Sequence, residues 1–199
     1  MSDTPDDTSK RTWLIASGCA GAIGGVATAI PFVSSFQPSE KAKAAGAAVE
    51  ADISQLKPGE KMTVEWRGKP VWIVRRTPEQ LAVLGKKDGE LADPKSERKP
   101  AELTPEYARN EARSIKPEVL VVVGICSHLG CSPSDKFQPG AQPSLPDDWA
   151  GGFLCPCHGS TFDMAGRVYK NKPAPDNLEV PPHTYLSDTR LLIGEDKKA

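Results

Sequence analysis

Two short segments decide the fold and the chemistry of this chain: Cys126-Ser127-His128-Leu129-Gly130-Cys131 and Cys155-Pro156-Cys157-His158-Gly159-Ser160. Together they hold four of the five cysteines and two of the three histidines. In each segment a Cys is followed within three residues by a His, and each segment has one further Cys. A doubled Cys and His pattern of this kind predicts a metal centre built from two loops.

Three chemistries could use this pattern. A structural zinc site has tetrahedral Cys and His ligands, but its usual spacing separates the cysteines from the histidines, whereas here they are interleaved. Two disulfides would suit an exported protein, yet they would not explain why a His follows a Cys in both segments. A 2Fe-2S centre with two Cys on one iron and two His on the other takes one ligand of each kind from each loop. We favour this third chemistry; the zinc alternative predicts a colourless protein.

Outside these segments the pattern is mainly that of β-strands. A hairpin is expected at 62–74, with its turn at 67–70, and Val119–Val123 is a β-branched run short enough for a buried strand. Further strands are expected at Gly152–Leu154, Arg167–Tyr169, Leu178–Val180 and Arg190–Ile193. Short helices are expected to begin at Thr77-Pro78 and Thr104-Pro105, which each combine a capping residue with a first-turn Pro. The sequence therefore predicts a mainly β head over residues 53–199.

The N-terminal part has the composition of a membrane helix. No Asp, Glu, Lys or Arg occurs from Thr12 to Ser39, and a helix over 12–30 would be about 28 Å long, close to the thickness of a bilayer core. A cleaved secretory signal with its site at Ala27-Thr28-Ala29 is the alternative, but the apolar core of such a signal is shorter than this run. We therefore predict a transmembrane anchor at 12–36. Gly21 and Gly25 form a GxxxG spacing, which would let another helix approach closely.

The charges that flank this segment do not orient it, because Lys10 and Arg11 precede it and Lys41 and Lys43 follow it. The order Ser9-Lys10-Arg11-Thr12-Trp13-Leu14-Ile15 resembles a twin-arginine export signal with Lys in the first Arg position. A signal of this type would carry a folded, cofactor-loaded domain outward. We therefore expect residues 1–11 to be cytoplasmic and the head to lie in the periplasm.

Composition narrows the possibilities further. With 199 residues the chain is long enough for one full domain and an extension, but not for a multidomain enzyme. Lys plus Arg number 25 against 26 Asp plus Glu, so no basic excess is available to hold nucleic acid. Residues 37–52 are Ala-rich with mixed charge, and we expect a flexible hinge linker there.

The motifs C-x-H-x-G-C and C-P-C-H-G-S resemble those of the Rieske iron-sulfur subunits of ubiquinol-cytochrome c reductase, the cytochrome bc complex. The resemblance extends to the N-terminal anchor, the linker and the Pro-rich segment Lys172-Pro173-Ala174-Pro175, so it covers most of the chain. It implies an antiparallel β-sandwich head with a small cluster-binding subdomain, preceded by one transmembrane helix. The cluster-binding loops would lie at 124–133 and 153–162.

The same resemblance assigns the cofactor and its ligands. It implies one [2Fe-2S] cluster, with Cys126 and Cys155 on the inner iron and His128 and His158 on the outer iron. Ser160 corresponds to a serine that donates a hydrogen bond to a bridging sulfide.

Three further residues take a role by resemblance. Cys131 and Cys157 correspond to the family's disulfide between the two loops, a pair that Rieske oxygenases and their ferredoxins usually lack. Leu129 corresponds to an exposed residue that packs against cytochrome b.

The function implied is that of an electron-transfer subunit of a respiratory chain. It would oxidise ubiquinol held in cytochrome b, pass one electron to a membrane-bound c-type cytochrome and contribute to proton translocation. His158 would accept a hydrogen bond and a proton from the quinol, and His128 is the second exposed ligand. The chain would be a single-pass protein of the bacterial inner membrane, within a dimeric multisubunit complex. The alternative is the Rieske small subunit of a periplasmic oxidoreductase such as arsenite oxidase, which would need no permanent anchor.

The sequence also departs from the family pattern. Phe162 stands where many relatives have a Tyr whose hydroxyl donates to a cysteine sulfur, so we expect a lower reduction potential than in those relatives. The 23 residues of 132–154 make a longer connection between the motifs than many relatives have, and we expect a surface loop. We expect packing or surface roles, not ligation, for Cys19, Trp66, Trp72 and His183.

Overall fold

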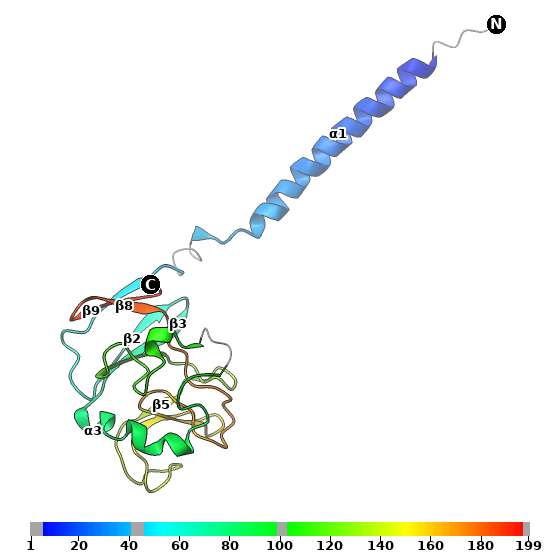
Figure 1. Ribbon diagram of the computed structural model, residues 1–199. Helices are drawn as coiled ribbons and strands as arrows, with labels where there is room; N and C mark the ends of the chain where they lie inside the picture. Colours follow the sequence, from blue (N-terminus) through cyan, green and yellow to red (C-terminus); the bar gives the residue numbers. More distant parts are fainter. Residues whose placement is uncertain (1–5, 41–45, 99–102, 197–199) are drawn as a thin grey trace. The chain divides into compact units, whose positions relative to one another are not determined.

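The computed structural model describes residues 6–40, 46–98 and 103–196. The chain divides into two compact units, residues 1–44 and 45–199. The first unit contains one long helix and the second contains a head made of small antiparallel sheets (Figure 1).

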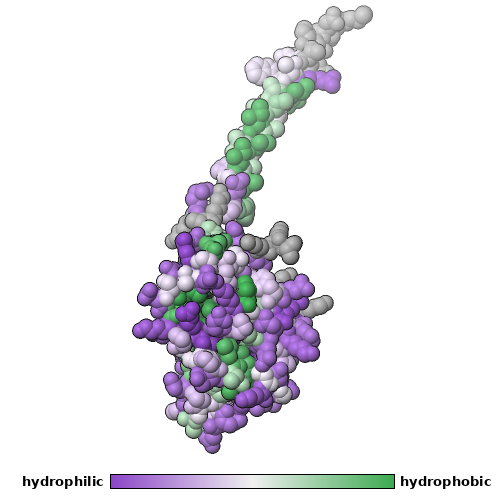
Figure 2. Space-filling view, turned by 60° about the vertical axis from the view of Figure 1, so that its left-hand side comes forward, coloured by the Kyte–Doolittle hydropathy of each residue, from purple (hydrophilic) through white to green (hydrophobic). Residues whose placement is uncertain are grey.

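The long helix, α1, runs from Asp6 to Ser35. Within Ser9–Ser35, an 18-residue window has a mean hydropathy of 1.6, so the helix is long and apolar enough to cross a membrane by length and composition. Large apolar side chains such as Trp13, Ile23 and Phe32 are exposed along it, and Figure 2 shows hydrophobic surface over the middle of the helix. The helix begins six residues before the predicted anchor, because the polar residues that precede the anchor are part of the same α-helix.

Among the described residues, nine strands form three sheets of three strands each. The sheet orders are β1-β9-β8, β2-β3-β4 and β5-β6-β7, with every pair antiparallel. The strand bounds are β1 Val49–Asp52, β2 Lys61–Trp66, β3 Lys69–Arg75, β4 Val119–Val123, β5 Ser134–Lys136, β6 Gly152–Leu154, β7 Thr161–Asp163, β8 His183–Ser187 and β9 Arg190–Ile193. Short helical segments lie at α3 Pro78–Leu81, η1 Leu84–Glu90 and η3 Glu106–Ala108.

Strand β4 lies between two hydrophobic cores. Successive residues of a strand point to opposite faces, and all five residues of β4 are buried. Leu120 and Val122 pack with Phe153 and Phe162 of the β5-β6-β7 sheet. Val121 and its neighbours on the other face pack with Ile193 of β9. The middle sheet therefore connects the subdomain that carries the Cys and His motifs to the β1-β9-β8 sheet.

The mainly β prediction is confirmed, and so are its hairpin at 62–74 and its strands at 119–123, 152–154 and 190–193. Thr77 caps α3 with a reciprocal capping box, in which Gln80 N–H donates to the Thr77 hydroxyl and the Gln80 side chain accepts from Thr77 N–H.

Two predicted strands, 167–169 and 178–180, are wrong. Neither segment forms a continuous ladder: Val168 and Tyr169 make only isolated bridges, to Phe162 of β7 and to Leu91. The Glu179 carbonyl accepts a backbone hydrogen bond from Val123 N–H of β4. Val168 N–H donates to the side chain of Asn177, and Val180 N–H donates to the carbonyl of Leu103.

The last four residues of the predicted linker belong to the head. Val49–Asp52 form β1, which pairs with β9 in the register Val49↔Ile193 to Asp52↔Arg190. The Ala-rich composition concealed this strand, but Ala51 is small enough to lie buried in the core against Leu191. Residues 41–45 of the same predicted linker lie outside the described residues.

Three buried arginines hold the turn that follows β7. Arg76 donates to the carbonyl of Met164, Arg113 to those of Ala165 and Gly166, and Arg167 to the Asp163 carboxylate. Burial lowers the pKa of both Arg76 and Arg113 to about 10, so both stay charged at neutral pH. Hydrogen bonds from charged donors are stronger than those from neutral donors, so these contacts fix the turn after β7. This turn lies at the far end of β7 from the second motif, which joins β6 to β7.

His183 is expected to make the stability of the head depend on pH. Its ring is buried, hydrogen-bonded through Nδ1 to the carbonyl of Pro181 and in edge contact with Tyr107. Burial lowers the pKa of His183 below its ordinary value of 6.5, so the unfolded chain binds this proton more readily than the folded one. We expect its contribution to stability to be complete above about pH 6.5 and to be lost as the pH falls through the lower folded-state pKa. Urea unfolding at pH 7.5 and 5.5 measures this loss; a His183→Gln variant with the same pH slope as the wild type would contradict it.

Candidate metal centre

The two motif loops follow the same backbone path. In the first, Cys126 N–H donates to the Cys131 carbonyl at 2.8 Å and Gly130 N–H donates to the Cys126 carbonyl at 3.1 Å. In the second, Cys155 N–H donates to the Ser160 carbonyl at 2.8 Å and Gly159 N–H donates to the Cys155 carbonyl at 3.0 Å. Each loop therefore folds back on its first Cys, although one follows the central strand β4 and the other joins β6 to β7.

Glycine is required at the same place in both turns. Gly130 has φ +82° and Gly159 has φ +74°, a region that residues with a side chain rarely adopt. The glycine shared by C-x-H-x-G-C and C-P-C-H-G-S is therefore needed for its positive φ. The motifs alone did not reveal this role.

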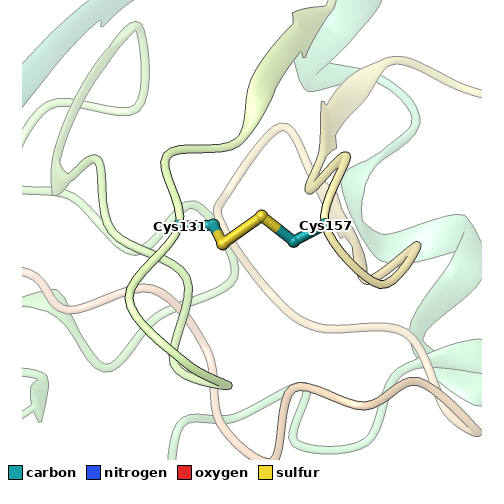
Figure 3. The surroundings of a disulfide bond; sticks show 2 residues. All are labelled: Cys131 and Cys157. Carbon is teal, nitrogen blue, oxygen red and sulfur yellow. A yellow bond between two sulfur atoms is a disulfide. The ribbon is translucent and has the colours of Figure 1, made fainter.

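A disulfide joins the two loops. Cys131 and Cys157 are bonded, with a sequence separation of 26 and their Cα atoms 6.7 Å apart. Figure 3 shows the bond bridging the first loop to the second. The predicted pairing is present, and it restrains two segments that have no regular structure of their own.

Four side chains remain at the ends of these loops. Cys126 and Cys155 are buried and, among the described cysteines, are outside any disulfide. The rings of His128 and His158 lie side by side, with their centroids 4.8 Å apart and their planes nearly perpendicular. His128 is half-buried and His158 is exposed. The site therefore has an inner pair of thiols and an outer pair of imidazoles.

This donor set fits a cluster with two kinds of iron ligand. Cys131, Cys155 and Cys157 bring their sulfur atoms within 4.8 Å of one another, but two of these sulfurs are bonded together and cannot act as thiolates. That leaves Cys155 as the one member of the group able to ligate, with Cys126 and the two histidines beside it. Two thiolates and two neutral imidazoles are the ligands of a Rieske centre.

The surroundings of Cys126 favour a metal-bound thiolate over a bare one. Burial raises the pKa of the Cys126 thiol, and the neighbouring Cys155 raises it further. Hydrogen bonds from His128 N–H and the Ser160 hydroxyl act in the opposite direction. Water cannot reach the buried sulfur to stabilise the negative charge of a thiolate. A metal ion bound to the sulfur would stabilise that charge instead.

The family model of the Rieske [2Fe-2S] domain matches residues 47–182. The chain belongs to the Rieske family. Its relatives include the "Ubiquinol-cytochrome c reductase iron-sulfur subunit" of Allochromatium vinosum, 54% identical over 189 residues that cover 94% of this chain and 89% of the relative. A subunit of the same name from Bradyrhizobium diazoefficiens is 39% identical over 191 residues, covering 95% and 96%. The "Cytochrome b-c1 complex subunit Rieske-1, mitochondrial" of Nicotiana tabacum is 41% identical over 167 residues, covering 83% and 55%.

A Pro-rich segment fastens both loops of this Rieske domain. The Ser127 hydroxyl donates to the Asp176 carbonyl at 2.6 Å and also accepts from Asp176 N–H. The Ser160 hydroxyl accepts from Ala174 N–H at 2.9 Å. Since a serine has one proton to donate, the Ser160 proton stays available for a sulfur. Sequence reasoning included Lys172–Pro175 in the resemblance but missed Ser127 and Asp176, whose pairing has no sequence signal.

The other predicted residues of the Rieske domain fall into two groups. Leu129 has 71% of its surface exposed, in contrast to the buried cysteines of its loop, so it is free for a partner to contact. Phe162 is fully buried in the same hydrophobic core as Cys126 and Cys155. Trp72 stacks on Phe153 within this core, as its predicted packing role requires.

The long connection is folded against the domain. Trp149 is buried, donates through Nε1 to the Lys136 carbonyl and lies 5.7 Å from the Tyr169 ring, centroid to centroid. Asp148 forms an ion pair with Lys87 of η1. Residues 138–148 are nevertheless largely exposed, in agreement with the predicted surface loop.

Proposed function

We propose that this chain is the electron-transfer subunit of a quinol-cytochrome c reductase, with Cys126, Cys155, His128 and His158 holding its [2Fe-2S] cluster. The observation that carries this proposal is the asymmetry of the site: the thiols are buried, whereas the imidazole of His158 is open to solvent. An exposed ligand can be reached directly by a substrate hydroxyl. The names of the relatives at 54% and 39% identity agree with this role.

When bound, the cluster supplies a one-electron acceptor. The residues of the chain would bind and orient the quinol: His158 would hold the cluster through one ring nitrogen, and its other ring nitrogen would accept the hydrogen bond and then the proton of the quinol hydroxyl. The ring of His128 lies beside that of His158, with the two centroids 4.8 Å apart, and would be the second imidazole ligand. Leu129 would supply the apolar contact with the cytochrome b subunit that excludes water from this hydrogen bond.

The proposal also includes the cellular location of the chain, its orientation in the membrane and its partner subunits. α1 would anchor the chain in a bacterial inner membrane with residues 1–11 in the cytoplasm and the head in the periplasm. The partners would be cytochrome b, which holds ubiquinol, and a membrane-bound c-type cytochrome, in a dimeric complex. Head residues 49–199 and linker residues 37–48 would then work as separate parts, since a single cluster must visit both a donor and an acceptor.

A redox titration of the full chain in detergent, followed by low-temperature EPR, tests this function. A Rieske signal that ascorbate can reduce is the expected result, because two neutral imidazoles raise the reduction potential and this chain also has the Cys131–Cys157 disulfide that the low-potential class usually lacks. A signal that forms only with dithionite would assign the chain to the low-potential ferredoxin and oxygenase class, and a colourless zinc protein would overturn the cluster itself.

Phe162→Tyr is expected to raise the midpoint potential of the cluster. A hydroxyl on this ring would donate to a cysteine sulfur and stabilise the reduced state. Because Phe162 is fully buried, the variant is also expected to lose some stability through overpacking. The same EPR titration measures the shift, and an unchanged or lowered potential would show that this position does not tune the cluster.

Stiffening the linker is expected to slow turnover of the assembled complex and leave the cluster intact. The change is Ala44-Ala45-Gly46 to three prolines, which restrict the backbone of a segment whose first two residues lie outside the described ones. Quinol-dependent cytochrome c reduction reports turnover, and EPR reports the cluster. Unchanged turnover at equal cluster content would count against a hinge in this segment.

A further inference from the structure

Cys155 is close to a disulfide in which it takes no part. Its sulfur and those of Cys131 and Cys157 all lie within 4.8 Å of one another, and only the latter two are bonded. Cys155 is buried and unpaired. A thiol this close to a disulfide needs only a small movement to reach the contact distance at which exchange occurs.

We propose that Cys155 attacks this disulfide whenever its sulfur is not bonded to iron, so that the cluster protects the native disulfide pairing. The Cys155 thiol gives its proton to solvent, and its sulfur forms a bond to Cys131 Sγ. The bond between Cys131 and Cys157 breaks, and Cys157 leaves as a thiolate that takes up a proton. The exchange leaves the number of thiols and disulfides unchanged, so it requires no oxidant or reductant. The proposal rests on the ligand role assigned to Cys155 above.

The environment of the three sulfurs selects the product. Cys157 is exposed whereas Cys155 is buried, so exchange moves the free thiol from a dry site to a solvated one. The new Cys131–Cys155 bond would enclose two residues fewer than the native separation of 26, and a difference this small leaves the loop-closure entropy almost unchanged. Attack on Cys157 would instead close a tight ring across Pro156 alone, which disfavours that product.

The other two thiols are less well placed. Cys126 is not a member of the group of three mutually close sulfurs. Cys19 belongs to the other unit, in the apolar helix α1. The expected product is therefore specific, with one new linkage and one newly accessible thiol.

The consequence concerns assembly. Once exchange has occurred, one of the four proposed ligands is locked in a disulfide, and the loops can no longer hold a cluster. A head that meets an oxidising compartment before it is loaded would be trapped in this form. Ligation of Cys155 must therefore precede oxidation of Cys131 and Cys157, and the chemistry of the chain imposes this order.

Two variants of the full chain in detergent test the exchange: Cys126→Ser and Cys155→Ser. Each lacks one proposed cluster ligand, so both are expected to be colourless, but only the first retains the attacking thiol. After incubation without reductant at pH 8, accessible thiols are alkylated and disulfide-linked peptides are identified by mass spectrometry. We expect at least tenfold more alkylation of Cys157 in Cys126→Ser than in Cys155→Ser, together with a Cys131–Cys155 linked peptide. Circular dichroism checks that both variants keep their β-structure.

The wild-type chain gives a second measurement that does not depend on a variant folding. Removing iron with a chelator should produce alkylated Cys157 at the rate at which the visible colour is lost, whereas the loaded chain keeps Cys131–Cys157. Persistence of the native linkage in the bleached chain and in Cys126→Ser would overturn the proposal. Linkage of Cys19 to either loop would do so too, because it would indicate random exchange in an unfolded chain. A Rieske EPR signal in the loaded wild type would leave the proposed function standing in either case.

Discussion

Replacing His128 or His158 with Ala is expected to abolish the Rieske EPR signal and to reduce quinol oxidation by the complex to background. The two rings lie with centroids 4.8 Å apart at the open side of a site whose thiols are buried. Each would supply one nitrogen ligand to the outer iron, and no other imidazole of the described residues lies in these loops. EPR of the purified chain and iron content per chain measure the effect directly.

The third histidine provides the matched control. His183→Gln removes a ring that is buried and bonded to the Pro181 carbonyl, so it should cost stability but leave the EPR line shape and the midpoint potential unchanged. A normal signal in His158→Ala, or a lost signal in a folded His183→Gln chain, would show that the ligands have been assigned to the wrong residues.

Replacing Arg167 with Met is expected to destabilise the head by about 3–5 kcal/mol. The guanidinium is fully buried and donates to the Asp163 and Asp88 carboxylates and to the carbonyl of Leu84. Without it, Asp163 would keep two backbone donors but would lose the charge that compensates its burial. Urea unfolding of the loaded chain, followed by tryptophan fluorescence and by loss of the visible absorbance, measures the change.

Two comparisons isolate the ion pair from the loss of packing. Lys116→Met removes a pair with Asp188, whose side chain is 97% exposed, and should cost under about 1 kcal/mol. Adding Asp163→Asn to Arg167→Met should recover part of the loss, because the buried carboxylate would no longer be charged. Additive costs in the double variant would mean that the buried pair is not energetically coupled.

Sequence reasoning recovered the strands whose residues are continuous and apolar. The strand at Val119–Val123 is buried on both faces, and the pattern that marks such strands is present without interruption. The strands it missed are short or polar: β1 Val49–Asp52, β5 Ser134–Lys136, β7 Thr161–Asp163 and β8 His183–Ser187. β5 and β7 pair with β6, and β1 and β8 pair with β9, so each depends on a partner strand that its own local sequence does not reveal.

The cysteines and histidines of the site could be predicted because their residue types and spacing are visible in the sequence. The residues that hold the two loops in place could not be predicted. Asp163 and the three arginines come together from segments that are up to 91 residues apart in the chain, and an arginine in sequence gives no sign that it will be buried. The Ser127 contact with Asp176 is of the same kind, because the half-buried Ser127 hydroxyl bonds to the backbone N–H and carbonyl of Asp176, which every non-proline residue carries.

The central position of strand β4 has a consequence for how the head moves. Because its two faces belong to two different cores, neither the cluster-binding sheet nor the β1-β9-β8 sheet can open without exposing residues shared with the rest. The head should therefore open as one cooperative unit, with the amide protons of β4 among the slowest to exchange with solvent. A rigid head can move between two partners without changing the surroundings of its redox centre. The flexibility needed for this movement must then lie outside the head.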